Sequence, residues 1–379
     1  MKYSNTFAFS TITLFTMMLV SCSNNTNKDT VTVSDTSKTK VTDTLTEVNI
    51  LKPAAAKPDW GKGLTDPMAV IIEKLGSYKA PGLTTLPAKE ARKQPTPADA
   101  TMDVMKAHKI IAPASNVDTT SKMILVKGGE IPVRIYTPKT GKASYPVIVY
   151  YHGGGWVIAN LDTYNASAEG LANQVDAIVI SVAYRQAPEF KFPTAHNDSY
   201  AAYEWAVKNA ASIKGDPKKI ALVGESAGGN LAAGVSMMAR DKKLQMPVYE
   251  VLVYPIAGYD FTTPSYTESD SVMPLSSGLM KWFFKNYLNS AADGMNPMIS
   301  LTKADLKGLP ATTIISAQYD PLRSEGELLR DNFKKAGIET NYKIYNGVTH
   351  EFFGMAAVLP EAKDAQAVAA AALSAAFKK

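Results

Sequence analysis

The chain has 379 residues, of which 46% are apolar, and a formal net charge of +5. The charges are spread along the chain rather than clustered, which argues against a nucleic-acid partner. There is no P-loop, Rossmann glycine fingerprint or HExxH pattern, and a single cysteine excludes an intrachain disulfide and argues against a cysteine zinc site. We therefore expect neither a metal nor a cofactor, and the composition leaves the oligomeric state open.

The amino-terminus predicts export. Lys2 is followed by an apolar stretch at 7–20, which is too short for a comfortable membrane span and suits a signal peptide over residues 1–21. The sequence Leu-Val-Ser-Cys that ends at Cys22 resembles a bacterial lipobox. It implies a mature chain that is lipidated on Cys22 and anchored to a membrane of the bacterial cell envelope. The alternative is an ordinary signal peptide with an incidental cysteine, which would give a soluble secreted protein.

Two segments of different composition follow. Residues 22–59 are rich in Thr, Ser, Asn, Lys and Asp, and they predict a disordered tether. In residues 60–115, apolar side chains from Met68 to Leu75 recur at helical spacing, and prolines separate short helical pieces. This second segment predicts a helical layer that packs on the core of the protein.

Residues 116–379 alternate between strand-like and helix-like stretches. The helical stretches include 198–210, 228–240 and 325–336, and the apolar runs are 131–136, 146–151, 177–182, 219–224, 248–254, 311–317 and 342–345. Such alternation predicts one α/β domain with a mostly parallel sheet that is covered by helices on both faces.

The motif HGGGW at 152–156 directly follows the apolar run at 146–151. Three consecutive glycines are costly in backbone entropy, which indicates a place where main-chain N–H groups approach a ligand closely. With the N–H of Ala227, those of Gly153 and Gly154 would form an oxyanion hole. The alternative is a plain glycine-rich turn. We expect His152 to pin this loop rather than to act as a base.

The motif GESAG at 224–228 lies between the apolar run at 219–223 and a helix-like stretch. This strand–turn–helix context is that of a nucleophile elbow, in which a sharp turn lifts one hydroxyl out of the sheet. The pentapeptide alone is a weak signal, but its context makes Ser226 a candidate nucleophile.

A serine hydroxyl needs a base, and the chain has four histidines. His350 is the best placed, because it follows a strand-like run and a turn near the carboxyl-terminus, whereas we interpret His108 and His196 as structural or exposed. In folds with such an elbow the orienting carboxylate lies between the serine and the histidine in chain order, and Asp320 ends the run at 311–317. Taken singly, Asp320 could be a turn residue and His350 a surface residue.

These motifs resemble the bacterial branch of the hormone-sensitive-lipase-like esterases, within the α/β-hydrolase superfamily. The resemblance runs from about Leu83 to the carboxyl-terminus and rests on HGGGW at 152–156, GESAGG at 224–229, DPLR at 320–323 and YxGxxHxF at 345–352, with weaker support from YRQAPE at 184–189. It implies an eight-stranded α/β-hydrolase sheet with a helical cap. It also implies Ser226 as nucleophile, His350 as base and Asp320 as orienter, with Gly153, Gly154 and Ala227 as the oxyanion hole. Two positions depart from the family pattern. Many members have an acidic residue where this chain has Ser324, and many have Asp where this chain has Glu225.

The resemblance also gives the segment at 60–115 a role as part of the cap. The long segment at 251–311 carries Trp282, Phe283, Phe284 and Tyr287 on an expected helix. It could supply a second part of the cap and a wall of the acyl pocket, or these aromatic side chains could simply pack in the core.

We therefore expect a serine carboxylester hydrolase that acts on short to medium acyl esters through a Ser-His-Asp acyl-enzyme mechanism, with a small ester as its substrate. An amidase or peptidase could use the same residues. A non-catalytic ligand-binding module of the same fold is the third possibility, although such modules usually lack a triad residue.

Overall fold

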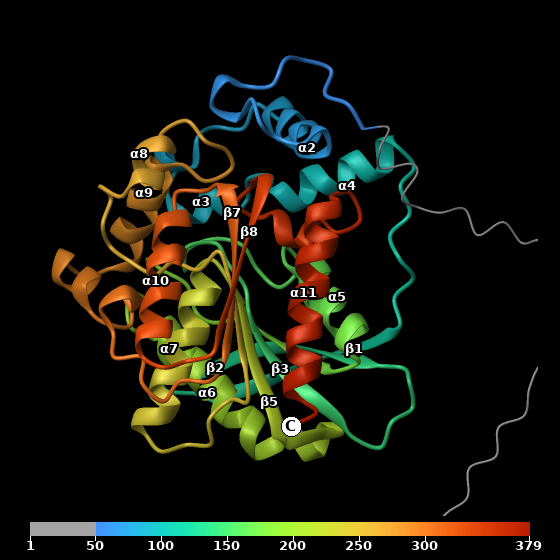
Figure 1. The fold of residues 1–379 in the computed structure, drawn as a ribbon, viewed down its shortest axis with the longest axis vertical. Coiled ribbons are helices and arrows are strands. Elements are labelled where there is room, and N and C mark those ends of the chain that lie inside the picture. The colour runs from blue at the N-terminus through green and yellow to red at the C-terminus, as the bar shows by residue number, and fades with distance from the viewer. Residues whose placement is uncertain (1–50) are drawn as a thin grey trace, which may run out of the picture. The chain divides into compact units, whose positions relative to one another are not determined.

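The computed structural model describes residues 51–379, so the predicted signal peptide, Cys22 and most of the predicted tether lie outside the described residues. An eight-stranded sheet forms the centre of this part of the chain (Figure 1). Its order is β1-β2-β4-β3-β5-β6-β7-β8. The β1–β2 and β2–β4 pairs are antiparallel, and all other pairs are parallel. The predicted mostly parallel, eight-stranded α/β sheet is confirmed.

The strands are β1 (Val117–Val126), β2 (Gly129–Pro138), β3 (Tyr145–Tyr151), β4 (Ile178–Val182), β5 (Gly215–Glu225), β6 (Glu250–Val253), β7 (Thr312–Tyr319) and β8 (Thr340–Thr349). The helices that flank them are α5 (Asn165–Val175), α6 (Thr194–Asn209), α7 (Ala227–Asp241), α10 (Arg323–Lys335) and α11 (Pro360–Ala376).

Both faces of the central strand β3 are buried. Alternate residues of a strand point to opposite faces, so Val147 and Val149 pack with α6, α7 and α10, whereas Ile148 and Tyr150 pack with α5 and α11. Figure 1 shows these two helical layers on either side of the strands. Because neither face of β3 or β4 meets solvent, these central strands are continuous apolar runs rather than alternating ones. The helical stretches predicted at 198–210, 228–240 and 325–336 are α6, α7 and α10.

The strand β1 was not among the apolar runs that the sequence indicated. It pairs along its whole length with β2 across the tight turn at Gly128, yet of its side chains only Val117 and Ile124 are buried. An edge strand with most side chains in solvent gives little hydrophobic periodicity.

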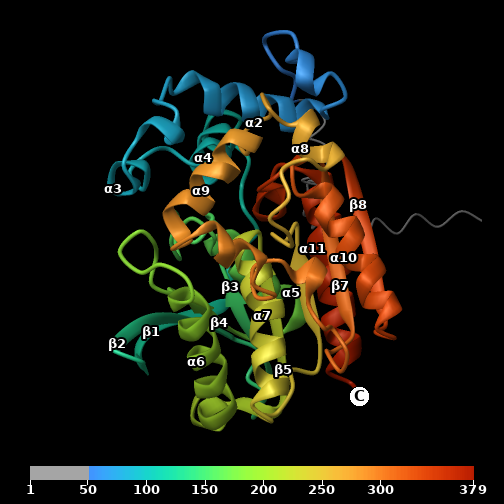
Figure 2. The same ribbon diagram turned by 90° about the vertical axis from the view of Figure 1, so that its left-hand side faces the viewer.

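A third group of helices lies beyond one end of the sheet. It comprises α2 (Asp66–Ser77), α3 (Ala88–Ala91), α4 (Pro97–Ala107), α8 (Pro264–Glu268) and α9 (Ser277–Tyr287). Figures 1 and 2 both show α2, α4, α8 and α9 at this end. Two segments far apart in the sequence, 60–115 and 251–311, thus meet on the same side of the fold.

The predicted end of the tether at residue 59 is wrong. Leu51 is only 2% exposed, and the N–H groups of Ala54 and Ala55 donate to the Glu73 carboxylate at 2.9 and 3.0 Å. Lys57 forms an ion pair with Asp66 at 2.7 Å. The prediction rested on the polar composition of this segment. It did not take into account that Leu51 is buried or that backbone N–H groups of the segment bind Glu73 on α2, so the ordered part of the chain already includes Leu51. Within residues 51–379, no helix combines the length and apolarity that a membrane crossing needs.

Leu51→Ala should lower the free energy of unfolding by about 2–3 kcal/mol, because it leaves a cavity under α2. Leu125→Ala is the matched control, since Leu125 is 78% exposed and its loss should change the free energy by less than about 0.5 kcal/mol. Urea unfolding of both variants measures the difference. Equal stabilities of the two variants would contradict the packing of this segment.

Candidate active site

Ser226 stands at a sharp turn between β5 and α7. Its backbone angles are φ 57° and ψ −119°, a conformation that residues other than glycine rarely adopt. The turn is fixed by its neighbours, because the Ser226 N–H donates to Val253 O at 2.9 Å and the Ser226 carbonyl accepts from Ile256 N at 3.2 Å. At Gly228 a Cβ would lie 1.9 Å from Tyr151 O, so only glycine lets α7 begin this close to the end of β3.

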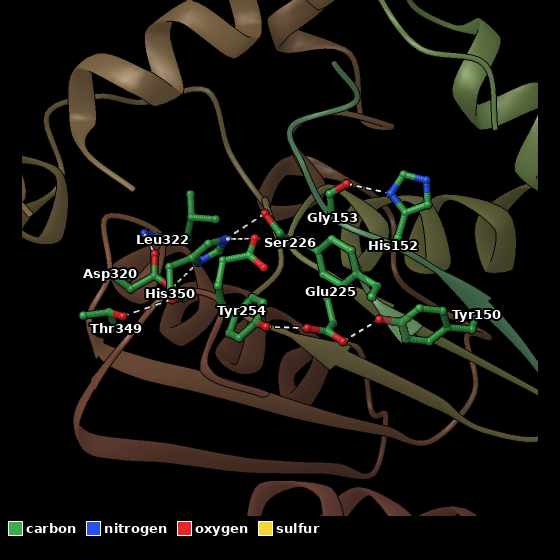
Figure 3. Close-up of polar contacts among 12 residues, drawn as sticks. Tyr150, His152, Gly153, Glu225, Ser226, Tyr254, Asp320, Leu322, Thr349 and His350 are labelled. Carbon is green, nitrogen blue, oxygen red and sulfur yellow. Dashed lines mark hydrogen bonds and ion pairs between the residues drawn. The ribbon is translucent and has the colours of Figure 1, made fainter. Parts of the chain in front are cut away.

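The structure brings Ser226, His350 and Asp320 together at the carboxyl ends of β5, β8 and β7 (Figure 3). Ser226 Oγ lies 2.9 Å from His350 Nε2, and His350 Nδ1 lies 2.7 Å from Asp320 Oδ2. All three residues are at most 3% exposed. The hydroxyl, imidazole and carboxylate therefore form one hydrogen-bonded line, as nucleophile activation requires.

Two loops hold the acid and the base. The second Asp320 oxygen accepts from Leu322 N at 2.8 Å, which fixes the carboxylate. Before the base, the Gly347 carbonyl accepts from Thr65 N at 2.9 Å, and Thr349 Oγ1 lies 3.7 Å from the sulfur of Met68 on α2. The amino-terminal segment thus supports the loop that carries His350.

Acidic neighbours raise the pKa of His350 above its ordinary value. Burial is the largest single effect and lowers that pKa, but the Asp320 carboxylate together with Glu351 and Glu225 outweighs it. An imidazole with raised proton affinity suits the removal of a proton from Ser226 Oγ.

The HGGGW loop approaches the same serine. Gly154 has φ +94°, and in the described residues no backbone carbonyl accepts the N–H of Gly153 or Gly154. The N–H of Ala227, at the start of α7, points out of the first helical turn. The three groups expected to form an oxyanion hole therefore lie on the two segments that Gly228 brings together, the end of β3 and the start of α7.

The remaining histidines do not reach the serine. His152 is buried, its Nδ1 lies 2.8 Å from Gly153 O and its ring stacks on Tyr184 with 4.4 Å between centroids, in agreement with a role in pinning the loop. Burial lowers the pKa of His152 and of His196 to about 4. His196 is a buried structural residue, with Nδ1 2.8 Å from Tyr287 Oη, and His108 is exposed.

Glu225, one of the two departures from the family pattern, sits behind the nucleophile. It is 1% exposed, and its two carboxylate oxygens accept hydrogen bonds from the hydroxyls of Tyr150 and Tyr254 (Figure 3). Burial raises its pKa to about 7, although both tyrosines act against the shift. The longer side chain therefore places a carboxyl group between two strands directly beneath the elbow.

The other departure, Ser324, ties α8 to the loop of Asp320. Its Oγ accepts from Ser265 N at 3.2 Å, its N–H donates to Ser265 Oγ at 3.1 Å, and Ser265 Oγ donates to Pro321 O at 2.6 Å. A neutral serine pair thus stands where an acid would add a charge near Asp320.

Two further acids near the site were missed in the sequence. Glu325 accepts from the N–H groups of Ala257 and Gly258 at 2.8 and 2.9 Å, and burial raises its pKa to about 8. Glu351 lies next to His350 and accepts from Tyr164 Oη at 2.6 Å. The only sequence signal for Glu351 was its position, as a charged residue directly after the candidate base His350. Among residues 51–379, no three His, Cys, Asp or Glu side chains are grouped as a metal ion would need.

Residues 148–354 match the family described as alpha/beta hydrolase fold. The carboxylesterase NlhH of Mycobacterium tuberculosis is 38% identical over 248 residues, which cover 64% of this chain and 78% of that protein. The arylesterase of Saccharolobus solfataricus is 36% identical over 62% of this chain and 78% of its own length. The ethyl acetate hydrolase of Pseudomonas putida is 32% identical over 62% of this chain and 76% of its own length.

Solved structures are similar over a larger part of the chain. The hyperthermophilic esterase of Pyrobaculum calidifontis has a TM-score of 0.74 and 34% identity, and the match covers 83% of this chain and 98% of that one. A thermostable esterase of Pseudomonas putida has a TM-score of 0.76 and 28% identity with the same coverage.

Glu225→Gln should remove a pH dependence of stability. The folded chain, with a Glu225 pKa of about 7, keeps a proton that the unfolded chain releases near pH 4.5. Wild-type stability should therefore fall relative to Glu225→Gln as the pH rises from 4.5 to about 7, and the difference should then level off. Each tenfold difference in proton affinity corresponds to about 1.4 kcal/mol.

Urea unfolding of both proteins across this pH range measures the difference. Glu339→Gln removes one charge at an exposed position before β8 and serves as the control. Parallel stability profiles for wild type and Glu225→Gln would show that Glu225 does not take up a proton on folding in this range.

Proposed function

This chain belongs to the alpha/beta hydrolase fold family and is a carboxylesterase-like hydrolase, and on that basis we propose that it cleaves carboxylic esters through an acyl-enzyme on Ser226. The observation that carries the proposal is the hydrogen-bonded line from Ser226 through His350 to Asp320. A ligand-binding module would have no need of three buried residues in this arrangement at a strained turn.

Acylation begins when His350 Nε2 takes the proton of Ser226 Oγ as the oxygen attacks the ester carbonyl. Asp320 holds the imidazole through Nδ1 and stabilises the positive charge that develops on it. The N–H groups of Gly153, Gly154 and Ala227 receive the oxyanion, and one such donor typically contributes about 10²–10³ in turnover. His350 then gives its proton to the leaving alcohol, and the acyl group remains on Ser226.

Deacylation reverses these roles with water. His350 takes a proton from the water molecule, the resulting hydroxide attacks the acyl carbonyl, and the same N–H groups hold the second oxyanion. Collapse of this intermediate releases the acid and returns the proton to Ser226. The raised pKa of His350 supports both proton transfers, because the imidazolium is an intermediate in each half.

The names of the relatives support a proposal for the substrate class. Their names describe a carboxylesterase, an arylesterase and an ethyl acetate hydrolase, which favours esters over amides and small acyl groups over long ones. We therefore infer that this chain acts on esters with short to medium acyl chains.

We further propose that residues 60–115 and part of 251–311 form a cap over the site. These segments lie at the end of the sheet where Ser226 emerges, and Ser226 is only 3% exposed. The ring of Phe283 on α9 lies against the HGGGW loop, since a Cβ at Gly155 would be 2.2 Å from it. A substrate reaches the hydroxyl by passing these elements, so they are suited to limit the size of the ester.

We also propose that Cys22 carries a lipid anchor and that the enzyme resides in the bacterial cell envelope. The proposal rests on the apolar stretch at 7–20 and on the lipobox-like sequence that ends in the only cysteine of the chain. Two or more acyl chains on one residue would give stable membrane attachment.

Ser226→Ala should lower ester turnover by about 10⁴–10⁶ while the fold stays intact, because it removes the nucleophile but little volume. Hydrolysis of p-nitrophenyl esters from acetate to laurate by wild type and variant measures the loss, and the optimum chain length gives the size of the acyl pocket. A matched p-nitroanilide series separates ester from amide activity.

Covalent labelling by a fluorophosphonate provides the control. The wild-type serine should react and Ser226→Ala should not, while circular dichroism of the two proteins should coincide. Near-normal turnover by a folded Ser226→Ala would overturn the assignment of the nucleophile.

Cys22→Ser should abolish incorporation of radiolabelled palmitate and move the protein out of the membrane fraction of a bacterial host. The thiol is the acceptor of the first lipid, and serine does not replace it. Ser21→Ala is the control, because it keeps a small residue before the cysteine. Unchanged fractionation of Cys22→Ser would mean that the chain is held at the membrane in another way.

A further inference from the structure

Glu351 places a carboxylate beside the catalytic base of the proposed reaction. Its Oε1 lies 3.9 Å from His350 Nε2, the same nitrogen that lies 2.9 Å from Ser226 Oγ. Asp320 contacts the opposite side of the ring, at Nδ1. The imidazole is thus flanked by two acids, and Glu351 is the one on the side where chemistry takes place.

Glu351 is less buried than the other acids around His350. Its side chain keeps 20% of its surface exposed, whereas that of Asp320 keeps 1%. Glu225 is also almost completely buried. Of these three acids, Glu351 is therefore the one that keeps side-chain surface for contact with an entering molecule.

The backbone of Glu351 indicates that the side chain itself matters. The residue is left-handed, with φ 71° and ψ 4°, a conformation that favours glycine over residues with a Cβ. Such a conformation persists where the surrounding structure imposes it, often at functional sites. The chain has a charged side chain at a position where glycine would fit more easily.

Tyr164 fixes the position of this carboxylate. Its hydroxyl donates to Glu351 Oε1 at 2.6 Å, and its side chain is buried directly before α5. The same hydroxyl lies against the HGGGW loop, because a Cβ at Gly153 would be only 2.2 Å away from it. Glu351 is therefore held between the base and the proposed oxyanion hole.

In the proposed reaction His350 Nε2 delivers a proton to the alcohol that leaves. The leaving oxygen must then come within about 3 Å of this nitrogen. A carboxylate oxygen 3.9 Å from the same atom lies close to the first atoms of the alcohol portion. It attracts positive charge and hydrogen-bond donors there, and it repels negative charge.

We propose that Glu351, held by Tyr164, is a specificity residue that selects esters whose alcohol portion carries an electropositive group, a cation or a hydroxyl, close to the ester oxygen. This inference rests on the proposed ester hydrolysis and deepens it by naming a class of alcohol. The aryl and simple alkyl alcohols of common test esters lack such a group.

The first test compares two acetate esters of nearly the same shape. Acetylcholine carries a quaternary ammonium group, and 3,3-dimethylbutyl acetate has a neutral carbon in its place. Burial raises the pKa of the Glu351 carboxyl above its ordinary value, so the comparison is made at about pH 8 to favour the charged form. There, wild type should show a higher kcat/KM for the cationic ester. Glu351→Gln, which keeps an acceptor for Tyr164 but no charge, should lower this preference by about tenfold, or about 1.4 kcal/mol.

The second test replaces charge by hydroxyls. Glycerol monoacetate and propyl acetate are compared in the same two proteins. A Glu351-dependent preference in the first pair alone identifies cations as the favoured group, and one in the second pair alone identifies hydroxyls. Dependence in both pairs means that either group is accepted, and each of these results supports the proposal.

Three variants separate specificity from a structural role. Glu351→Gly removes the carboxylate and relieves the left-handed backbone, so it should lose the preference without loss of thermal stability. Tyr164→Phe keeps the Glu351 carboxylate but removes the hydroxyl that fixes its position, so it should weaken the preference. Glu339→Gln, which removes a charge from the opposite end of β8, should leave the preference unchanged.

Turnover of p-nitrophenyl acetate is the reference for all proteins. Serine-dependent turnover with substrate ratios that do not change in Glu351→Gln would overturn the role of Glu351 and leave the esterase intact. Failure of wild type to hydrolyse any of the five esters would overturn the proposed function, and the role of Glu351 with it.

Discussion

The turn at Ser226 is the constraint on which the rest of the site depends. A left-handed serine is unfavourable, and it persists because β6 and α7 hold its N–H and carbonyl on both sides. The same turn directs the first N–H of α7 toward the loop after β3. The proposed nucleophile and oxyanion donors are therefore set by one local geometry, while the proposed acid and base must be brought to it by β7 and β8. Parallel strands achieve this because their carboxyl ends lie along one edge of the sheet.

The three acidic side chains around His350 differ in how deeply they are buried. Asp320 is fully enclosed and orients the imidazole, Glu225 lies beneath the elbow between Tyr150 and Tyr254, and Glu351 borders the open side. Each acid favours the protonated imidazole. In the proposed reaction, a proton taken from the serine or from water is therefore stabilised on His350. The buried acids act through fixed fields, and only the outer one can act on a ligand directly.

Most of the fold and the three central side chains could be predicted because their signals are local. An apolar run, a glycine-flanked serine and a histidine after a turn are each visible within a few residues. Glu225 was noticed as a departure from the family pattern. Its partners Tyr150, on β3, and Tyr254, directly after β6, are distant in the sequence, and no local pattern identifies them. Glu351 could not be identified from the sequence, because the residue that fixes its carboxylate, Tyr164, lies 187 positions earlier. The order of residues 51–59 was mispredicted for the same reason, since it depends on α2 rather than on the composition of the segment.

The contacts between the amino-terminal segment and the loop of His350 bear on when the enzyme becomes active. Thr349 and Met68 are 281 positions apart, and Gly63 binds the hydroxyl of Tyr319 across 256 positions at 3.0 Å. Pairings of such long range are slow to form, because a long loop must close before the contact contributes to stability. A nascent polypeptide that has folded its elbow still lacks a supported base until both ends have met. Proteolytic loss of α2 from a finished molecule would remove the same support, so a segment that holds none of the proposed catalytic residues is nevertheless a structural partner of the loop that carries His350.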